Sequence, residues 1–413
     1  MPLTPPLSER GNGLASRSPM PEYIAQHFTR VDDDGYTGLA ISENKLVWDL
    51  LEPRLNSNRA VPSSAIGYDD MAGSLDFRTS VAQFASEYVW GRHVDADEVV
   101  VLAGAGSILE TLFYAIADPG DAILVPTPSY AGFWADIETR DELHIVEVPT
   151  SPDESFALTT ERLQAAYDIS PWPVRALLIT NPSNPTGRIH TDSEIREAVT
   201  WARSVGIHIV MNEVYALSVL GDASFVPSGR IVNPNQGDIH FVWAFSKDFA
   251  MSGMRCGVLT TTNEDVRAAI TSLAYWSLVS GDTQHFLGSL LRDSEWVDMY
   301  IATMRSRLTT SHTATTEALE AAGISYVPAD AGLFVLLDMR EFLSEPTWDA
   351  EQELWNTIFD EANVNLTPGS ACHIDEPGFM RLCFAVAPAD TVVAAIGRIH
   401  KVLKEREGLP VRR

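Results

Sequence analysis

The stretch Phe241-Val-Trp-Ala-Phe-Ser-Lys-Asp-Phe-Ala-Met-Ser-Gly-Met-Arg-Cys-Gly257 places a lysine at the end of an apolar run. Burial disfavours the charged form of a lysine, and a neutral amine can form an imine with an aldehyde. Ser246 and Arg255 add a hydroxyl donor and a planar cation, which together suit a phosphate group. Only four of the 29 basic residues are lysines, so keeping Lys247 here indicates a chemical role. The alternative is a strand-end lysine whose amine reaches water.

Lys247 follows one of a series of short apolar runs, and this series predicts the fold. The expected strands are Glu98–Leu102, Ala122–Pro126, His144–Val148, Ala176–Thr180, His208–Met211, His240–Ala244 and Gly257–Thr261. Most are continuously apolar, as in strands covered on both faces, and helical patterns over residues 160–167 and 193–204 separate some of them. The alternation predicts an α/β domain with a mostly parallel sheet, in which ligands bind beyond the carboxyl ends of the strands.

The pattern changes after about residue 286. A long helix over 294–321, a strand pair over 326–328 and 332–338, and a final helix over 388–407 predict a smaller α+β domain. We expect a flexible arm over residues 1–22, a segment over 23–60 that packs with the small domain, a large ligand-binding domain over 61–290 and the small domain over 291–413.

The composition excludes several classes of protein. The formal net charge of −27 argues against nucleic-acid binding, because phosphate backbones are recognised by basic patches. No run of eighteen apolar residues is present, so no membrane span is expected. Cys256, Cys372 and Cys383 lie among apolar or small residues and form no disulfide framework, which favours a cytoplasmic location.

A second candidate site is Ala103-Gly-Ala-Gly-Ser-Ile-Leu-Glu-Thr111, a strand end that runs into a helix. The backbone amides of Ala105, Gly106 and Ser107 would lie at the helix N-terminus, where anions bind. A dinucleotide-binding fold is rejected because position 109 is leucine instead of a third glycine, and no acidic residue ends the next strand. A glycine turn with a purely structural role remains the alternative.

Three further candidates follow other predicted strands. Tyr130 could stack on a flat ring, although a core tyrosine is the commoner meaning. The turn Asn181-Pro-Ser-Asn-Pro-Thr-Gly187 directs the Asn184 amide towards the edge of the sheet. Tyr215 follows the next strand, and it or Asn184 could hydrogen-bond a phenolic oxygen, or both could be ordinary turn residues.

Arg381 lies among apolar residues in the predicted small domain, within Glu376-Pro-Gly-Phe-Met-Arg-Leu-Cys-Phe-Ala385. A buried arginine requires an anion. The sequence leaves two candidates open for that anion, a substrate carboxylate and an internal Asp or Glu.

In their order and spacing, these segments resemble the fold-type I pyridoxal-phosphate enzymes of the class I/II aminotransferase superfamily, and within them the 1-aminocyclopropane-1-carboxylate synthases. The match runs from about Gly35 to the end of the chain. The 181–187 turn and Ser246-Lys247 are typical of the superfamily, whereas Ser42-Glu-Asn44, Cys372-His373 and Gly378-Phe-Met-Arg381 resemble the synthase branch. The resemblance implies an aspartate-aminotransferase-like fold with a seven-stranded sheet, pyridoxal 5'-phosphate as cofactor, and a homodimer with shared active sites.

The resemblance also assigns a role to each candidate residue. Lys247 resembles the lysine that holds the cofactor as a Schiff base and acts as general base. The groups that resemble the phosphate-binding residues are Ala105, Gly106, Ser107, Ser246 and Arg255, and Tyr130 resembles the aromatic residue that stacks on the ring. Asn184 and Tyr215 resemble the partners of the phenolic oxygen. Arg381 resembles the arginine that binds the substrate carboxylate, Asn184 a further substrate-binding residue, and Glu43 a substrate-side acid. Tyr68 resembles a tyrosine that reaches the neighbouring subunit's phosphate, although the synthases carry it nearer Gly73, where this chain has Met71.

Asn212 departs from the family, which has an aspartate at this position. A carboxylate there keeps the ring nitrogen of the cofactor protonated, whereas a neutral amide stabilises that proton poorly. Glu213 should point elsewhere if Asn212 ends a strand, because successive side chains face opposite sides. A ring that withdraws electrons less strongly disfavours full transamination.

The resemblance implies an enzyme that acts on an α-amino acid, most simply S-adenosylmethionine, with loss of methylthioadenosine. Attack by the α-carbon on the γ-carbon would give a cyclopropane, and additional loss of a β-proton would allow γ-replacement or annulation with a second substrate. The alternatives are a pyridoxal-phosphate aminotransferase and a non-catalytic sensor domain. The acidic charge and the lack of a basic helix-turn-helix segment count against the sensor.

Overall fold

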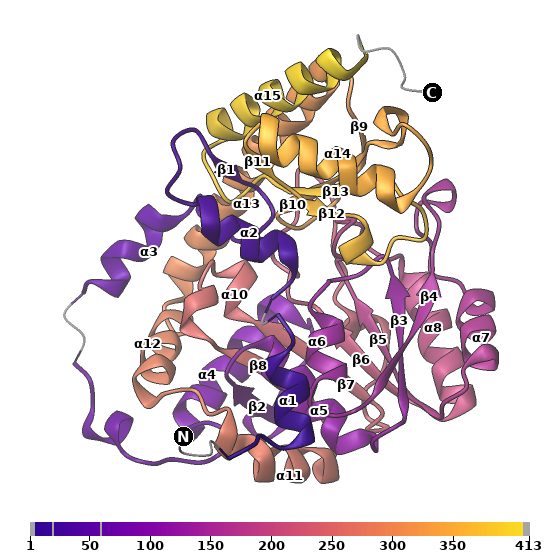
Figure 1. Ribbon diagram of the computed structural model, residues 1–413. Helices are drawn as coiled ribbons and strands as arrows, with labels where there is room; N and C mark the ends of the chain where they lie inside the picture. Colours follow the sequence, from indigo (N-terminus) through magenta and orange to yellow (C-terminus); the bar gives the residue numbers. More distant parts are fainter. Residues whose placement is uncertain (1–4, 19, 58–59, 408–413) are drawn as a thin grey trace.

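The computed structural model describes residues 5–18, 20–57 and 60–407. Within these residues, a seven-stranded sheet and a four-stranded sheet form two adjoining parts of the molecule (Figure 1). The predicted combination of a mostly parallel sheet with a smaller α+β part is confirmed.

All seven predicted strands of the large sheet are present, within two residues of their expected bounds. They are β2 (Val99–Leu102), β3 (Ala122–Thr127), β4 (His144–Pro149), β5 (Val174–Thr180), β6 (His208–Asn212), β7 (Ile239–Ala244) and β8 (Gly257–Thr261). Their order in the sheet is β2-β8-β7-β6-β5-β3-β4. Within this described sheet, β8 runs in the opposite direction to the other six strands, which are parallel to one another.

Both faces of this sheet are buried. Val99 and Val101 join one apolar core, and Val100 and Leu102 join another, because alternate residues of a strand face opposite sides. Helices α5 (Ala105–Ile116), α6 (Phe133–Glu138) and α11 (Glu264–Leu273) contribute to the second core, whereas α4 (Leu75–Phe84), α7 (Thr160–Ile169), α8 (Asp192–Val205) and α12 (Gly281–Leu291) contribute to the first. The short helices α9 (Ser228–Ile231) and α10 (Phe245–Asp248) follow β6 and β7.

Local signals determine both ends of α8, which connects β5 to β6. Thr191 Oγ1 accepts a hydrogen bond from the Glu194 backbone N–H, and the Glu194 carboxylate accepts one from the Thr191 N–H, so the two residues form a capping box. Gly206 ends the helix with a φ of 75°, a left-handed conformation that glycine adopts without strain. The connection therefore returns the chain to the sheet in parallel orientation.

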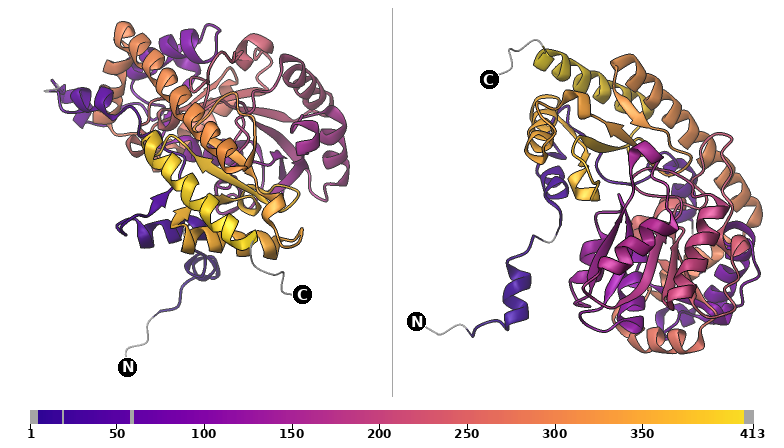
Figure 2. Two further views of the ribbon diagram at one scale, coloured as in Figure 1. Left: turned by 90° about the horizontal axis from the view of Figure 1, so that it is seen from above. Right: turned by 90° about the vertical axis from the view of Figure 1, so that its right-hand side faces the viewer.

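The four-stranded sheet is antiparallel, with the order β12-β13-β10-β9. Its strands are β9 (Ser325–Val327), β10 (Phe334–Asp338), β12 (Thr367–Pro368) and β13 (Phe379–Cys383), and the helices of this part are α13 (Ser294–Ala322), α14 (Trp348–Glu361) and α15 (Ala389–Glu407). Figure 2 shows α15 lying along α13, with which it is in contact. The long helix predicted over 294–321 is confirmed as α13.

The N-terminal segment contains α1 (Glu9–Ala15), which lies in the predicted arm, then α2 (Glu22–Arg30), β1 (Thr37–Gly38) and α3 (Trp48–Leu55). Arg10 of α1 pairs with Glu142 in the part with the larger sheet, whereas Arg30 of α2 pairs with Asp360 in the part with the smaller sheet. Strand β1 pairs in parallel with β11 (Val364–Asn365). The domain boundaries themselves remain predictions. In the described part of the chain, no helix has the length and apolar character needed to cross a membrane.

Candidate active site

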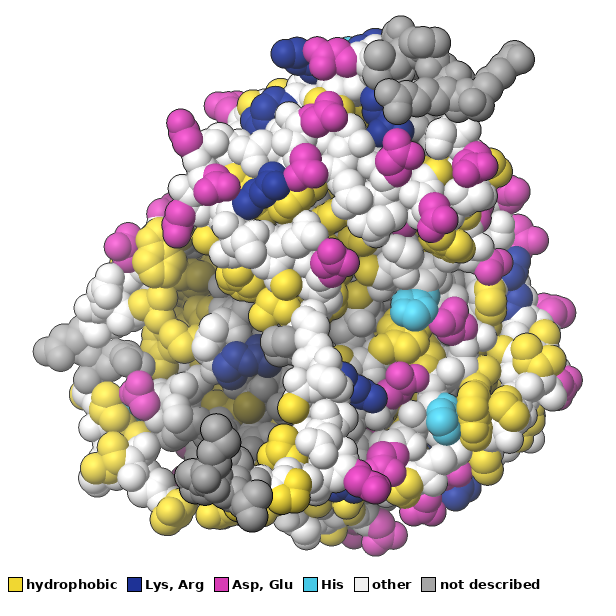
Figure 3. Space-filling view, in the orientation of Figure 1, with side chains coloured by type: hydrophobic (Ala, Val, Ile, Leu, Met, Phe, Trp, Pro, Cys, Tyr) yellow, Lys and Arg dark blue, Asp and Glu magenta, His cyan; other side chains and the backbone are white. Residues whose placement is uncertain are grey.

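The candidate site lies at the edge of the seven-stranded sheet where its parallel strands end. The chain leaves the sheet at this edge after β2, β3, β5, β6 and β7, and it enters β8 here because β8 runs in the opposite direction. Figure 3 shows a hollow between the upper and lower parts of the molecule, in which Lys or Arg side chains are exposed. The predicted convergence of strand ends is therefore present.

Lys247 lies in α10, directly after β7. Its Nζ donates a hydrogen bond to the carbonyl oxygen of Ser42 at 2.7 Å. Burial, together with the positive charge of Arg381, lowers the pKa of Lys247 to about 8. Part of the amine is therefore neutral near neutral pH, and the neutral form is the one that attacks an aldehyde.

Asp248, the next residue, was not predicted as part of the site. Its carboxylate accepts hydrogen bonds from Trp243 Nε1 at 2.9 Å, Ser218 Oγ at 2.7 Å and the Leu217 backbone N–H at 3.1 Å. Burial raises the pKa of Asp248 to about 7. The residue joins α10 to the turn that follows Tyr215, and its only signal in the sequence is an acid within an apolar run.

The N-terminus of α5 forms a corner suited to an anion. No side chain caps this helix, which begins at Ala105 after Gly104, so the N–H groups of its first turn, including those of Gly106 and Ser107, face no capping group. Gly104 has a φ of 97°, and a Cβ added to it would lie 2.4 Å from Arg255 Nη2. Glycine at this position therefore lets the guanidinium approach the end of the helix.

Arg255 reaches this corner, where its charge opposes the rise that burial causes in the pKa of the nearby Asp136 carboxyl. The guanidinium donates hydrogen bonds to the carbonyl oxygens of Ser252 at 3.1 Å and Ala103 at 3.3 Å. Among the described ion pairs, none involves Arg255. Ser246, in the first turn of α10, lies one residue before Lys247. The corner thus combines a helix N-terminus with a guanidinium, which is the arrangement expected for a phosphate.

Asn184, Tyr215 and Arg381 form one buried network. Asn184 Oδ1 accepts a hydrogen bond from Arg381 Nη1 at 2.9 Å, and Asn184 Nδ2 lies 3.5 Å from the Tyr215 hydroxyl. Burial raises the pKa of Tyr215, so its hydroxyl stays protonated and can donate a hydrogen bond. The structure brings together three residues that lie far apart in the chain, as the sequence predicted.

Arg381, in β13, is 3% exposed. Its Nη2 donates to the Ala40 carbonyl at 2.7 Å and to Thr367 Oγ1 at 3.0 Å, and its guanidinium lies 5.2 Å from the centre of the Phe334 ring. Its Nε has no hydrogen-bond partner in the described chain, and no described carboxylate pairs with it. The alternative that an internal Asp or Glu pairs with Arg381 is therefore wrong for the described residues.

Asn212 ends β6 and is 5% exposed. Its Nδ2 lies 3.3 Å from Thr180 Oγ1, and its Oδ1 has no hydrogen-bond partner among the described residues. Glu213 points elsewhere, as predicted: its Oε1 accepts a hydrogen bond from the Ser228 backbone N–H at 2.8 Å, and burial raises its pKa to about 8. The polar group that faces the site at this strand end is therefore the amide of Asn212.

Tyr130 and Glu43 line the site from two sides. Tyr130 follows β3 and is 41% exposed, with its ring edge-on to Phe133 at a centroid distance of 5.3 Å. Desolvation of its hydroxyl and the nearby Asp136 carboxylate raise the pKa of Tyr130, and the positive charges of Arg381 and Arg255 oppose this rise, so the hydroxyl lies in the field of both cations. The Glu43 carboxylate accepts a hydrogen bond from Ser252 Oγ at 3.4 Å.

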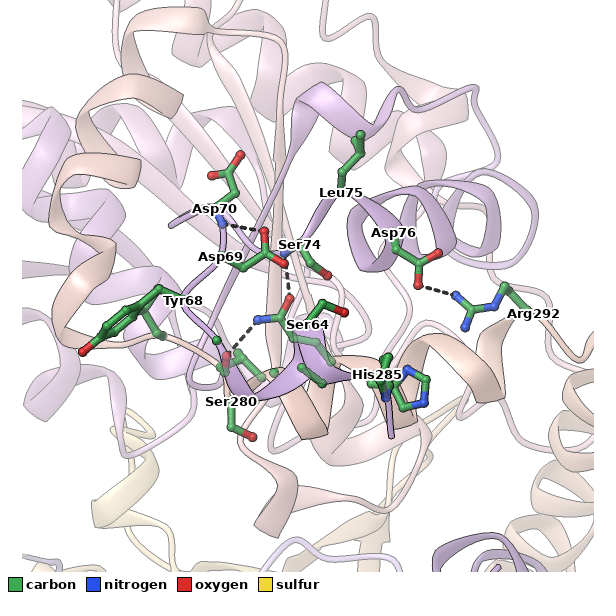
Figure 4. Close-up of a pocket in the computed structure, with 17 residues that line it drawn as sticks. Ser64, Tyr68, Asp69, Asp70, Ser74, Leu75, Asp76, Ser280, His285 and Arg292 are labelled. Atoms are coloured by element: carbon green, nitrogen blue, oxygen red, sulfur yellow. Dashed lines mark hydrogen bonds and ion pairs between the residues drawn. The ribbon is translucent and has the colours of Figure 1, made fainter. Parts of the chain in front are cut away.

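Tyr68 is the one predicted site residue that the described chain leaves apart from the others. It is 93% exposed and lines a separate surface cavity of about 690 Å³ with residues such as Asp76, Ser280 and Arg292. Figure 4 shows the Tyr68 ring at the side of this cavity, away from the Asp76–Arg292 ion pair. A chemical role for Tyr68 would require a second subunit.

The described groups fit a phosphorylated aromatic aldehyde and an amino acid bound beside it. Lys247 supplies the amine, Arg255 and the start of α5 supply the anion corner, and Tyr130 supplies an exposed ring face. At this site, Asn212 Oδ1 and Arg381 Nε are among the buried polar atoms that have no hydrogen-bond partner in the described chain. Both atoms are therefore available to bind polar groups of a ligand.

Comparisons with known proteins agree with this arrangement. The sequence pattern of the family "Aminotransferase class I and II" matches residues 44–399. The chain is 33% identical to 1-aminocyclopropane-1-carboxylate synthase 6 of Arabidopsis thaliana, over 91% of this chain and 79% of that protein, and 32% identical to 1-aminocyclopropane-1-carboxylate synthase of Malus domestica, over 91% and 84%. Among solved structures, aspartate aminotransferase of Thermus thermophilus with maleate is similar, with a TM-score of 0.79, 23% identity, and 97% and 100% of the two chains covered.

Proposed function

The chain belongs to the class I and II aminotransferase family and is an enzyme related to the 1-aminocyclopropane-1-carboxylate synthases, and from this premise we propose that it uses pyridoxal 5'-phosphate to act on S-adenosylmethionine. The observation that carries the proposal is the buried Arg381, which has no carboxylate partner among the described residues and whose charge helps to lower the pKa of Lys247. A free amine beside an unpaired guanidinium matches an α-amino acid substrate.

In the proposed complex, Lys247 binds the aldehyde of the cofactor, Arg255 and the N-terminus of α5 bind its phosphate, and Tyr130 stacks on its ring. Asn184 and Tyr215 donate hydrogen bonds to the phenolic oxygen. Bound pyridoxal phosphate supplies an aldehyde that links to amino groups and a ring that withdraws electrons from the carbon beside them.

Arg381 orients the substrate by holding its carboxylate, and Asn184 Oδ1 fixes the guanidinium through the 2.9 Å hydrogen bond. Lys247 Nζ then removes the α-proton. The new bond forms between the α- and γ-carbons while the bond between the γ-carbon and sulfur breaks. The electron pair of the broken carbon–sulfur bond leaves with the sulfur of methylthioadenosine. In the other route, a β-proton is lost in addition to the α-proton. A second nucleophile can then attack the γ-carbon, which gives γ-replacement or annulation.

Asn212 favours this chemistry over transamination. A neutral amide beside the ring nitrogen stabilises a positive charge there less than a carboxylate does, which weakens the electron withdrawal that full transamination requires. Loss of a sulfonium leaving group requires less electron withdrawal by the cofactor ring. We therefore place S-adenosylmethionine ahead of a transamination substrate.

The test is incubation of the purified protein and pyridoxal phosphate with S-adenosylmethionine. We expect methylthioadenosine to be released and detected by chromatography, alone or only when a second nucleophilic substrate is supplied. The Lys247→Ala protein is the control for non-enzymatic breakdown. Conversion of the cofactor to pyridoxamine phosphate by amino donors, with no methylthioadenosine, would instead identify an aminotransferase.

Replacing Asn212 with aspartate is expected to have opposite effects with and without cofactor. Without cofactor, the new carboxyl group would be buried beside Thr180, and burial places its pKa above the unfolded value, so stability is lost as pH rises above about 4. We expect a loss of about 1–3 kcal/mol at pH 7 in chemical unfolding. With cofactor, the pair of carboxylate and ring nitrogen should tighten binding and speed pyridoxamine formation. Equal stability of both proteins at pH 4 and pH 7 would contradict the buried position.

We also propose that the enzyme is a homodimer in which Tyr68 completes the partner subunit's site. Two large side chains that line the cavity are mostly exposed, Tyr68 (93%) and Leu75 (60%). Three more exposed side chains lie within three residues of lining residues in the sequence: Ile66 (84%), Tyr275 (58%) and Trp276 (77%). An apolar surface of this kind is typical of an interface between subunits.

Mixing the Tyr68→Ala and Lys247→Ala proteins, after conditions that let subunits exchange, is expected to restore activity that neither protein has alone. Half of the dimers would be mixed, and each mixed dimer would have one intact site, so recovery approaches about a quarter of the parent activity. The oligomeric state is checked by sedimentation. A mixture as inactive as its components would place Tyr68 in its own subunit's site or outside any site.

A further inference from the structure

The loop at Cys372 and His373, which the sequence marked as synthase-like, holds the two parts of the molecule together. The His373 ring stacks on Trp134 with a centroid distance of 3.4 Å and an angle of 4° between the rings. His373 Nδ1 lies 2.8 Å from Glu147 Oε1, and the Cys372 carbonyl accepts a hydrogen bond from the Ser129 backbone N–H at 2.8 Å. We call these five residues the clamp.

On the side of the small sheet, the clamp is tied to the strand that carries Arg381. Glu351 accepts hydrogen bonds from the backbone N–H groups of Ser370 at 2.9 Å and Gly378 at 2.7 Å, which fixes both ends of the clamp loop. Thr367, just before the loop, pairs with Arg381 in the sheet and accepts its hydrogen bond at 3.0 Å. A movement of the loop would therefore be transmitted to the Arg381 guanidinium.

On the side of the large sheet, the clamp encloses Tyr130. Ser129 precedes Tyr130, Trp134 lies four residues after it in α6, and Phe133 N–H donates to the Tyr130 carbonyl at 3.0 Å. Glu147 lies on β4, which pairs with β3, the strand that leads to Tyr130. The clamp thus connects the ring that faces the cofactor with the guanidinium that faces the substrate.

His373 adopts a left-handed backbone conformation, with a φ of 54°. This conformation costs a non-glycine residue about 1 kcal/mol or more, and it persists when surrounding contacts favour it. The stack on Trp134 and the hydrogen bond to Glu147 supply such contacts. Both of them depend on a histidine at this position, since a smaller residue would form neither.

We propose that His373 is a positioning residue: through Trp134, Glu147 and Ser129, it sets Arg381 and Tyr130 at a common spacing for the amino-acid substrate. This inference rests on the proposed function, in which Arg381 binds the substrate carboxylate and Tyr130 stacks on the cofactor. His373 itself touches neither group.

The test compares His373→Ala with the parent in two measurements. Hydrogen exchange of the Ser129 amide, measured without substrate, is expected to become faster because its acceptor Cys372 loses its anchor. The KM for S-adenosylmethionine is expected to rise about tenfold with little change in kcat, as for the loss of one aromatic stack and one hydrogen bond. Glu147→Gln keeps an acceptor for His373 and should remain close to the parent.

The matched control is His93→Ala, because His93 also contacts an acid, Asp95 at 3.1 Å, but on the exposed surface. It should leave both measurements unchanged. Unchanged hydrogen exchange of the Ser129 amide in a folded His373→Ala protein would overturn the proposal. Faster exchange with an unchanged KM would also overturn it, because the clamp would then have only a structural role. If the parent does not turn over S-adenosylmethionine, the proposed function fails, while the exchange experiment still reports on the clamp.

Discussion

Replacing Lys247 with alanine is expected to abolish turnover, with a loss of roughly 10⁴-fold or more in kcat. In the proposed mechanism this one amine both binds the cofactor covalently and moves the α-proton. Of the other described lysines, Lys45 pairs with Glu43 at 3.8 Å but its side chain is 61% exposed, and Lys401 and Lys404 lie in α15. None of these amines shares the burial that lowers the pKa of Lys247.

The lowered pKa of Lys247 makes a further expectation testable with the parent protein. Below about pH 8 the amine is mostly protonated, and above it mostly neutral. The rate at which cofactor-free protein binds pyridoxal phosphate covalently should therefore rise with pH and level off above about pH 8. Absorbance spectroscopy follows the reaction, and borohydride reduction followed by mass spectrometry identifies the modified residue.

The remote lysine Lys401 provides the control for these measurements. Its side chain is 76% exposed and lies near Glu405, so Lys401→Ala should keep the activity, colour and borohydride sensitivity of the parent. If the Lys247→Ala protein stays yellow and is reduced by borohydride at another lysine, the cofactor is attached elsewhere and the mechanism is wrong.

Replacing Arg381 with leucine is expected to reduce kcat/KM for the amino acid by about a hundred- to a thousandfold, mainly through KM. A buried charge-assisted pair between guanidinium and carboxylate is worth several kcal/mol once one partner is removed. Arg381→Lys should recover little, because an ammonium group cannot make the directed bonds that the guanidinium makes to Ala40, Thr367 and Asn184.

The same substitution should cost little stability in the protein without substrate. Arg381 has no carboxylate partner among the described residues, so leucine removes a buried charge that lacks a counter-ion. Leucine also leaves the acceptors of Ala40, Asn184 and Thr367 without their donor, which opposes this gain. We expect the melting temperature to change little. Arg398→Leu is the matched control: this arginine also bonds only neutral groups, Ala362 O and Thr37 Oγ1, but it lies outside the site, so its loss should leave KM unchanged.

A large loss of stability in Arg381→Leu, with KM close to the parent value, would contradict a substrate role for this arginine. Such a result would mean that the guanidinium stabilises the fold through its contacts with Ala40 and Thr367 alone. Comparing thermal unfolding with initial rates on the same preparations separates the two outcomes.

Sequence patterns were sufficient for the main fold because their signals are local. Continuous apolar runs predicted the seven strands to within two residues, and alternation with helices predicted a mostly parallel sheet. Once the sheet is parallel, its strand ends meet at one edge, so residues that follow different strands, such as Asn184 and Tyr215, are expected to lie together, and their side chains lie 3.5 Å apart.

The sequence could not decide which buried charge lacks a partner, because a partner is defined by distance in space. The groups around Arg381 come from residues 40, 184 and 367, and no spacing in the chain shows that an acid is absent from them. The clamp partners of His373 and the bonds that hold Asp248 were hidden for the same reason. Thus the sequence by itself determined the helices and strands and the sheet edge where they meet. Only the tertiary structure decided which polar groups at that edge remain free for a ligand. The reason is that hydrogen bonds form between neighbours in space and leave no periodic pattern along the chain.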